Sequence, residues 1–495
     1  MTWILLTILI LLLAFHYLRR HFQYWQSCAI PSDVPNWIFG NFGSALTTKS
    51  LCQLFADYYE KYKLQGPFVG FYCFSQPTVF VMDPELIRRL LITDFSKFNN
   101  HMMYCNEKDD ALTGQLFNLT GDRWRTMRQK LTPNFTSGKI KAMVPMITKI
   151  AMEFVQVLEE EILKTNGILN IPDFMNRFTS DITGSCSFGL EINSLRQSEC
   201  EFRTMCHKAL GQHRYGLLGY FVRLCFPKLS HRLHIKETLP EVERFFMNLV
   251  KDTVAYRESN SVRRNDFMDM LIELKKGADG LSIKEVAAQA FLFMLAGYES
   301  TSSTLTYALY ELAQNQKVQE KARHEIMEVL RRHNGCLGYE CLRELVYLEQ
   351  IMQETLRLYP IGYVLTRQAL EDYRIPDYPQ HFIKKGMPIF IPAGAIHRDE
   401  RYFPQPNIFN PDNFNMENLK SRNSILNLSF GQGPRNCIGL RFAKMQTLIG
   451  LSLLLRNFKF SICNLTPIPL VYKKRNFMNY PEKSIYLKVE KIEEK

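Results

Sequence analysis

The segment 430–439 carries the residues best suited to chemistry in this chain. It reads Phe-Gly-Gln-Gly-Pro-Arg-Asn-Cys-Ile-Gly, so two glycines and a proline make a rigid loop with few side chains. Cys437 follows this loop at the expected start of a helix, where loop amides and the helix N-terminus stabilise a negatively charged sulfur. Arg435 offers a cation suited to a carboxylate, and Gly439 lets another group approach closely. The sequence therefore predicts a thiolate at Cys437.

This loop has two other possible interpretations. A phosphate-binding loop would need a following GKS or GKT, and the GxGxxG spacing fails at Asn436. A buried structural cysteine after a turn is the default for any single cysteine. The chain has 12 cysteines and no CxxC pair, so neither a zinc ribbon nor a thioredoxin-like site is indicated. Most of these thiols are expected to be buried in a reducing compartment.

The loop resembles the haem-binding signature of the cytochrome P450 superfamily, F-x-x-G-x-R-x-C-x-G. The fixed positions of that signature are filled by Phe430, Gly433, Arg435, Cys437 and Gly439. Three more segments resemble family motifs in the family's order: Trp-Arg-Thr-Met-Arg at 124–128, Ala-Gly-Tyr-Glu-Ser at 296–300 and Glu-Thr-Leu-Arg at 354–357. The longer sequences around residues 124 and 430 are most similar to those of the insect microsomal group called family 6.

This resemblance implies a haem b cofactor with Cys437 as the axial ligand of the iron. A thiolate ligand pushes electron density onto the iron and favours O–O cleavage. The resemblance also implies which other residues belong to the cofactor site. Those expected at the haem propionates are Trp124, Arg128, Arg435 and Arg367, and the others expected at the cofactor are Phe430, Gly433, Gly439, Ala296 and Gly297.

The catalytic residues implied by the resemblance are Glu299, Ser300 and Thr301. Glu299 and Ser300 are expected to relay protons to bound dioxygen. The family usually has Thr where this chain has Ser300, and Ser keeps the hydroxyl with freer rotamers. Thr301 points about 100° further round a helix, so it does not simply substitute for that threonine.

Glu354 and Arg357 are expected to be a structural pair. They stand three residues apart, so they face the same side of a helix, and if buried each charge needs the other. The resemblance implies that this pair locks the fold near the cofactor. In the family an arginine from a later segment joins the pair, but this chain has Asn413 at that position. An amide can hydrogen-bond Glu354 but brings no charge.

The pattern of the rest of the chain predicts the elements that position these residues. Ser282 and Glu285 form a capping box, and the apolar pattern then continues to about Ala313, which gives a helix of ~45 Å. Residues 121–360 are mainly helical, 78–82 and 363–396 favour short strands, 398–436 are irregular, and 438–456 are helical. We therefore expect an α+β fold that is mainly α. With the resemblance, this is the cytochrome P450 fold: one helix-dominated catalytic domain over 31–495 with small β-sheets.

Residues 1–30 are expected to be a membrane anchor and hinge. Positions 3–18 are almost wholly apolar, and Arg19 and Arg20 follow. A span needs ~20 residues, so the run is marginal but adequate with its flanks. A cleaved signal peptide is disfavoured because no positive residue precedes the run and no A-x-A site follows it. The charges after the run predict a cytosolic body, and the resemblance implies the endoplasmic reticulum membrane.

Composition limits the partners. The chain has 495 residues, 46% hydrophobic and 22% charged, which excludes a disordered protein, and its net charge is +12. That charge suits an acidic partner or a membrane face, whereas no nucleic-acid module is present. The resemblance implies a lipophilic small-molecule substrate and an NADPH–cytochrome P450 reductase that supplies electrons from NADPH. Basic residues that could dock this reductase are Arg123, Arg125, Lys130, Arg441 and Lys444.

The resemblance implies a monooxygenase that inserts one oxygen atom of O2 into a lipophilic xenobiotic, steroid, fatty acid or hormone. Expected pocket residues, for each of which ordinary core is an equal alternative, are Phe291, Met294, Leu295, Val364 and Leu365. The apolar run 217–226 could be a second contact with the bilayer. Two alternatives remain: a haem-thiolate isomerase or dehydratase that needs no reductase, and a non-catalytic haem carrier or sensor. The presence of Glu299 and Ser300 favours the monooxygenase.

Overall fold

A computed structural model of the chain describes residues 19–212, 214–376, 378–474 and 479–493, together with Trp3, Leu5, Leu6 and His16. Most of the expected anchor, residues 3–18, therefore lies outside the described residues. Within the described part of the chain, every helix is either too short or too polar to span a bilayer.

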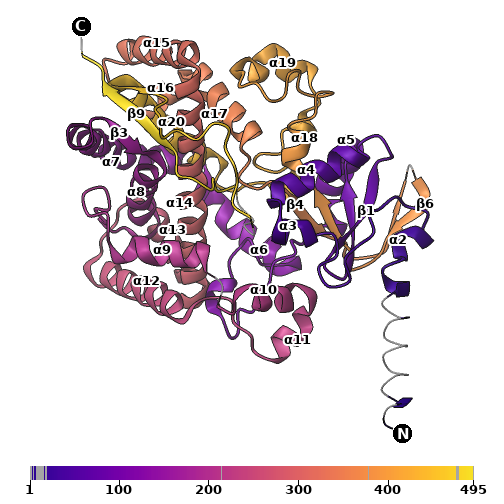
Figure 1. Cartoon of the computed structure of the whole chain (residues 1–495). Coiled ribbons are helices and arrows are strands. Elements are labelled where there is room, and N and C mark those ends of the chain that lie inside the picture. Colours follow the sequence, from indigo (N-terminus) through magenta and orange to yellow (C-terminus); the bar gives the residue numbers. More distant parts are fainter. Residues whose placement is uncertain are drawn as a thin grey trace.

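Helices make up most of the molecule (Figure 1). In chain order the α-helices are α2 (Tyr24–Ser27), α3 (Gly43–Thr47), α4 (Leu51–Tyr62), α5 (Pro84–Arg88), α6 (Gly121–Leu131), α7 (Ser137–Lys164), α8 (Ile171–Thr183), α9 (Glu201–Gly211), α10 (Gly216–Cys225), α11 (Pro227–Arg232), α12 (Pro240–Asn260), α13 (Phe267–Lys276), α14 (Ile283–Gln314), α15 (Gln316–Arg332), α16 (Tyr339–Glu344), α17 (Val346–Leu358), α18 (Ala393–Ile396), α19 (Met416–Ser421) and α20 (Leu440–Asn457). The predicted α+β fold that is mainly α is confirmed.

The strands form small sheets. In chain order they are β1 (Phe68–Cys73), β2 (Gln76–Val81), β3 (Ile168–Asn170), β4 (Leu365–Gln368), β5 (Tyr373–Ile375), β6 (Tyr378–Ile383), β7 (Pro388–Ile391), β8 (Phe458–Ser461) and β9 (Tyr486–Lys491). The largest sheet has the order β1-β2-β7-β4, in which only β2 and β7 are parallel. A second sheet has the order β3-β9-β8, and β5 pairs with β6.

Helix α14 crosses the helical part of the molecule, as the sequence predicts (Figure 1). The predicted capping box is present: Ser282 Oγ accepts the Glu285 N–H, and the Glu285 carboxylate accepts the Ser282 N–H. In the polar middle of the helix, Ser302 and Thr304 donate back to the carbonyls of Glu299 and Ser300. These hydroxyls are therefore satisfied without breaking the helix.

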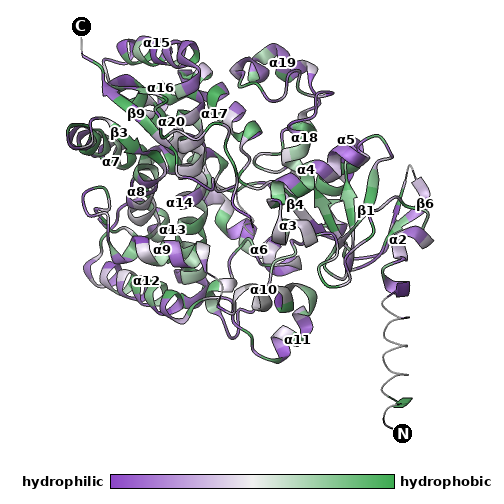
Figure 2. Cartoon of the chain, in the orientation of Figure 1, coloured by the Kyte–Doolittle hydropathy of each residue, from purple (hydrophilic) through white to green (hydrophobic). Residues whose placement is uncertain are grey.

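Two hydrophobic clusters support this arrangement. The larger one surrounds α14 and includes buried residues of α7, α8, α12, α17 and α20. The smaller one joins the four-stranded sheet to α4, where Phe71 and Phe80 are fully buried. Burying one such side chain contributes about 1.5–3 kcal/mol. Figure 2 shows the strands around β1 as mostly green, that is hydrophobic, whereas helices such as α12 carry both green and purple stretches.

Candidate active site

The loop before α20 holds Cys437 in a fixed position. The Cys437 N–H donates to the Phe430 carbonyl over 2.8 Å, which closes the loop. Helix α20 begins at Leu440 with Gly439 as its N-cap, so Cys437 precedes the helix instead of opening it. The Gly439 N–H and the nearby Arg128 lower the pKa of the Cys437 thiol, but burial among protein atoms raises it by more. A metal ion would still remove the proton, since a coordinated thiol is deprotonated outright.

The backbone of this loop leaves no room for a side chain at Gly433. Gly433 has φ +74°, and a Cβ built there would lie 1.8 Å from the Leu91 carbonyl oxygen. At Gly439 the nearest atom to such a Cβ would be Phe135 Cε1 at 3.8 Å, so that glycine borders more open space. Gly433 therefore serves close packing of the loop against the turn 89–93.

Three arginines predicted to hold carboxylates lie close together. Arg128 on α6 donates to the Asn436 carbonyl and side-chain oxygen, each over 3.0 Å. Arg435 donates to the carbonyls of Asn99, Phe117 and Leu119, and its guanidinium lies 4.9 Å from the centre of the Trp124 ring. Trp124 is itself buried. The sequence-predicted group is thus brought together by α6, β4 and the 430–437 loop.

These cations repel one another. Burial, followed by the charges of Arg367 and Arg128, lowers the pKa of Arg435 to about 9. Burial lowers the pKa of Arg367 to about 10. The partners found for Arg128, Arg367 and Arg435 in the described part of the chain are carbonyls, an amide and an imidazole, with no carboxylate among them. Buried positive charges of this kind need an anionic partner.

His101 is a member of this cluster that the sequence analysis did not find. Its Nε2 lies 3.3 Å from Arg367 Nη1, and its Nδ1 is buried without a hydrogen-bond partner in the structure. Arg367 Nε is likewise unsatisfied. Burial and the two arginines Arg367 and Arg435 hold the pKa of His101 well below its usual range. The unsatisfied nitrogens of His101 and Arg367 are hydrogen-bond donors available to an anion.

The middle of α14 has an accessible side. Ala296 is exposed although its neighbours Phe293, Met294 and Tyr298 are buried, and Cys437 is exposed although protein surrounds it. Accessible surface at these depths indicates a space inside the molecule. Gly297 faces elsewhere, because a Cβ there would lie 2.9 Å from Thr183 on α8. Its lack of a side chain therefore allows close helix packing.

The three hydroxyl and carboxyl groups predicted to be catalytic face different ways. Ser300 Oγ donates to the Ala296 carbonyl on the accessible side of α14. Thr301 is buried and accepts a hydrogen bond from Gln446 on α20. The Glu299 carboxyl is buried and accepts a hydrogen bond from Ser303 Oγ over 3.2 Å. Burial raises the pKa of Glu299, and the hydroxyls of Tyr480 and Ser303 lower it by less.

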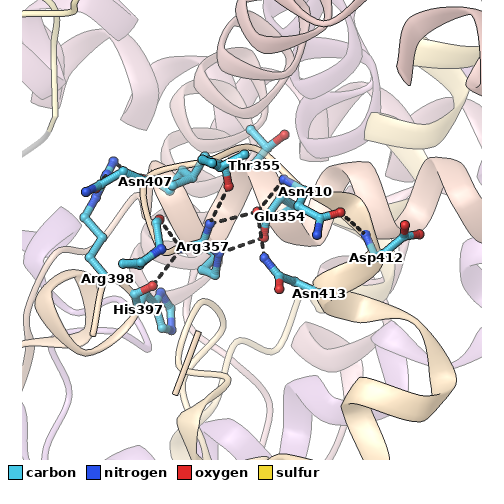
Figure 3. A network of polar contacts seen from close by, with 12 residues as sticks. Glu354, Thr355, Arg357, His397, Arg398, Asn407, Asn410, Asp412 and Asn413 are labelled. Atoms are coloured by element: carbon cyan, nitrogen blue, oxygen red, sulfur yellow. Dashed lines mark hydrogen bonds and ion pairs between the residues drawn. The ribbon is translucent and has the colours of Figure 1, made fainter. Parts of the chain in front are cut away.

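The structural pair is fully buried and bidentate (Figure 3). Arg357 Nε and Nη2 donate to the two oxygens of Glu354 over 2.7 and 2.8 Å. Asn413 Nδ2 donates to Glu354 Oε1 over 3.1 Å, as expected for an amide at that position. Arg357 Nη1 also donates to the carbonyls of His397 and Pro406. The pair thus connects α17 to His397, just before the irregular region 398–436, and to Pro406 and Asn413 within that region.

The expected pocket residues divide into two groups. Phe291 and Met294 are buried in the larger hydrophobic cluster, where Met294 Sδ lies 3.2 Å from Cys206 Sγ. Leu295, Val364 and Leu365 are half-buried. These three half-buried residues are therefore better placed to contact a ligand than Phe291 and Met294.

The basic residues expected to dock an acidic partner are partly neutralised. Arg123 pairs with Glu107 and Glu285, Lys444 pairs with Glu349, and Arg125 lies 3.8 Å from Asp122. Lys130 and Arg441 instead donate to the carbonyls of Asp279 and Phe135. The positive charge on this surface is thus smaller than the sequence suggests.

The residues present fit a haem. A haem carries two propionates, and the cluster of Arg128, Arg367, Arg435 and His101 presents buried donors that lack a carboxylate in the described residues. The same loop that supplies Arg435 supplies a partly accessible thiol at Cys437, and thiolate is an established ligand of haem iron. Both chemical ends of the cofactor therefore have matching groups.

Comparison with known proteins agrees with this assignment. The sequence model of the family described as Cytochrome P450 matches residues 30–489. The chain is 46% identical over 500 residues to Probable cytochrome P450 6a21 of Drosophila melanogaster, an alignment that covers 99% of each protein. It is 46% identical over 500 residues to Cytochrome P450 6a9 of the same species, with 99% of each covered. It is 40% identical over 492 residues to Cytochrome P450 6A1 of Musca domestica, covering 98% of this chain and 96% of that protein.

Proposed function

The chain belongs to the cytochrome P450 family, and we propose that it is a monooxygenase that inserts one oxygen atom of O2 into a lipophilic small molecule. Haem b, when bound, supplies the activation of dioxygen at its iron. Cys437 would be the axial ligand. The observation that carries the proposal is the cluster of buried arginines beside an accessible thiol, because it needs the anionic groups that a haem provides.

The chain's own residues would hold the cofactor from two sides. Arg128, Arg367, Arg435 and His101 would donate to the propionates, and Trp124 would keep Arg435 in place through the contact of its ring with the guanidinium. Each charge-assisted hydrogen bond contributes about 1.5–3 kcal/mol. Phe430, Gly433 and Gly439 would fix the position of Cys437 by shaping the loop that the Cys437 N–H closes on the Phe430 carbonyl. Ala296, on the accessible side of α14, would face the reaction space.

Glu299 and Ser300 would transfer protons toward dioxygen. Ser300 presents its hydroxyl on the accessible side of α14, where the hydroxyl would turn away from the Ala296 carbonyl, to which it donates in this structure, in order to donate to dioxygen. Glu299, one residue away, would hold a proton on its carboxyl and take a new one from water. Thr301 bonds to Gln446, which supports a role in joining α14 to α20.

The substrate and its route follow from the apolar residues. Leu295, Val364 and Leu365 would contact a lipophilic substrate, with Phe291 and Met294 behind them. The N-terminal segment would anchor the protein in the endoplasmic reticulum membrane, with the catalytic domain on the cytosolic face. Exposed apolar residues near both α2 and α11 would rest on that membrane: Val34, Trp37, Ile38, Phe226, Leu229 and Leu233.

Electrons would come from NADPH through a membrane-bound reductase. Lys130 and Arg441 support this docking because, among the residues that the structure describes, the hydrogen-bond partners found for them are carbonyls and not carboxylates. The other basic residues of this surface would contribute less, since each has an acidic partner.

The absorption spectrum of the dithionite-reduced, CO-bound protein tests the central claim. We expect a strongly red-shifted Soret band for the native chain and its loss in Cys437→Ser. A band typical of histidine-ligated haem, or no bound haem, would contradict the assignment of Cys437. Substrate-dependent NADPH consumption with a reductase then separates a monooxygenase from an isomerase or a carrier, neither of which consumes NADPH.

A further inference from the structure

The segment 360–364, which joins α17 to β4, belongs to no helix or strand. Among the described residues, the hydrogen bonds found for its carbonyls come from distant parts of the chain. Asn479 Nδ2 donates to the Pro360 carbonyl over 3.1 Å. The Gly394 N–H donates to the Tyr363 carbonyl over 3.0 Å. The position of this segment therefore depends on groups outside it.

The two ends of the segment are held in different ways. At its C-terminal end the chain enters the four-stranded sheet, where Leu365 pairs with Ile391 of β7. The Tyr363 ring packs against the backbone just beyond β7, because a Cβ at Gly394 would lie 2.3 Å from that ring. Backbone pairing and packing thus hold this end. At the other end, the hydrogen bond to the Pro360 carbonyl comes from a side chain.

Asn479 is suited to hold the Pro360 end because three elements meet at it. It is buried and lies between β8 and β9. Its backbone carbonyl accepts the hydroxyl of Tyr307 on α14, and its Oδ1 accepts the thiol of Cys52 on α4. Turning the amide round would place Oδ1 against a carbonyl and lose both side-chain hydrogen bonds. Nδ2 is therefore kept directed at the Pro360 carbonyl.

Helix α14 also contacts the residue before Pro360. The Tyr307 ring stacks on the Tyr359 ring, with ring centres 4.5 Å apart and planes 8° apart. The Tyr359 hydroxyl donates to the carboxylate of Glu311, one turn further along α14. Pro360 is therefore fixed relative to α14 both through its carbonyl and through the preceding side chain.

We propose that Asn479 is a positioning residue that fixes Val364 and Leu365 relative to α14 and so determines which shapes of lipophilic molecule bind. This rests on the proposed function, in which Val364, Leu365 and Leu295 of α14 contact the substrate. With Asn479 in place, this wall of the pocket is ordered before a ligand arrives. Without its Nδ2, the Pro360 carbonyl loses its donor and the segment gains freedom. Ordering the segment then lowers the affinity for every ligand that touches it.

The test compares Asn479→Ala with Tyr310→Phe in the haem-loaded protein. Tyr310 is a matched control because its hydroxyl donates to the Pro467 carbonyl over 3.0 Å. It therefore also links α14 to the region between β8 and β9, but without contacting Pro360. The first readout is hydrogen–deuterium exchange of the peptide 359–366. We expect its amides to exchange several-fold faster in Asn479→Ala and at the native rate in Tyr310→Phe.

The second readout is the binding of imidazole and of 4-phenylimidazole, each followed by the Soret shift that occurs when the azole nitrogen coordinates the iron. Imidazole is too small to reach the pocket wall, whereas the phenyl ring extends into the pocket. We expect Asn479→Ala to bind 4-phenylimidazole more weakly by roughly three- to ten-fold, the effect of one ordinary hydrogen bond, and imidazole as the native protein does. Tyr310→Phe should bind both azoles with native affinity.

An unchanged exchange rate of the peptide, or an unchanged ratio of the two affinities, in Asn479→Ala would overturn the proposal. Equal effects in Tyr310→Phe would also overturn it, because they would come from loosening the region between β8 and β9. Should Asn479→Ala fail to fold, Asn479→Ser takes its place, since its hydroxyl keeps the site polar but is too short to reach the Pro360 carbonyl.

Failure of the proposed function would look different. The native protein itself would then show no Soret shift with either azole, or no thiolate-ligated haem in its CO-bound spectrum. The exchange measurement needs neither turnover nor a ligand. It therefore still reports whether Asn479 holds the segment that begins at Pro360.

Discussion

Arg128 shows how one residue can serve the loop and the cofactor together. Its two hydrogen bonds to Asn436 hold the guanidinium next to Cys437, and its charge lowers the pKa of that thiol. Burial lowers the pKa of Arg128, which means that the surrounding protein does not compensate the charge. An anion bound nearby would relieve this cost. Arg128 is therefore expected to matter more for keeping haem than for keeping the fold.

The substitution Arg128→Gln removes the charge and keeps a hydrogen-bonding amide. We expect haem to dissociate faster by roughly ten- to a hundred-fold, because one charge-assisted interaction of about 1.5–3 kcal/mol is lost. Transfer of haem to apomyoglobin measures this rate. Arg125→Gln is the control, since Arg125 lies on the same helix but is exposed and only 3.8 Å from Asp122. Equal rates for the two variants would show that Arg128 does not hold the cofactor.

Asn413 adds a hydrogen bond, but no charge, to the buried ion pair of Glu354 and Arg357. It donates one of the hydrogen bonds to Glu354 Oε1, and the Asn410 N–H donates another over 2.9 Å. We expect Asn413→Ala to lose about 1–3 kcal/mol of unfolding free energy and to lose haem on heating at a lower temperature. Asn413→Asp should be worse, because it places a second carboxylate beside Glu354. Full haem occupancy after heating Asn413→Ala would contradict this role, and Lys420→Ala, an exposed change in the same segment, should have no effect.

At the scale of elements, the conformation of the loop before α20 depends more on Gly433 than on Gly431. Gly431 and Gly433 have φ of +69° and +74°, but a Cβ would collide with neighbouring backbone only at Gly433, where the Leu91 carbonyl lies too close. A Cβ at Gly431 would make an ordinary contact of 3.6 Å with Asn436 Cα. We expect Gly431→Ala to cost about 1–2 kcal/mol for the left-handed conformation alone. Gly433→Ala should cost several kcal/mol more and lower haem content, since the turn 89–93 or the loop must move. Urea unfolding of both variants measures the difference, and equal losses would show that the close approach is unimportant.

Local signals in the sequence located the elements well and their distant partners poorly. The capping box of Ser282 and Glu285 depends only on residues close together in the chain, and the sequence predicts it correctly. The start of α20 was placed two residues early because Cys437 continues the loop. His101 carries no local signal, because it joins the site by meeting Arg367, a residue far away in the chain.

Across the whole molecule, buried charges link stability to pH. His397 is buried at the end of α18, its Nε2 accepts the Leu428 N–H over 3.2 Å, and its carbonyl accepts Arg357. Burial, with a smaller effect of Arg357, lowers the pKa of His397 to about 3. The unfolded chain has an ordinary histidine pKa of about 6.5, so below that pH the unfolded state binds a proton that the folded state excludes. This site therefore lowers stability as the pH falls.

The magnitude follows from linkage. One proton of difference costs about 1.4 kcal/mol for each pH unit, over the window from about pH 6.5 down toward 3. Buried carboxyls such as Glu299 and Glu311 act in the opposite direction, because burial raises their pKa and the folded state binds the extra proton. These contributions are shared by the native chain and by His397→Gln, so they cancel in the comparison.

The substitution His397→Gln tests this contribution. Between pH 6.5 and 4, we expect the unfolding free energy of His397→Gln to fall less steeply with decreasing pH than that of the native chain. The two slopes should differ by up to about 1.4 kcal/mol per pH unit, which corresponds to one proton. Urea unfolding of the haem-loaded proteins at several pH values measures both slopes. Parallel slopes would contradict this account: His397 would then be protonated in the folded protein, with Nε2 donating to the Leu426 carbonyl 3.1 Å away instead of accepting the Leu428 N–H.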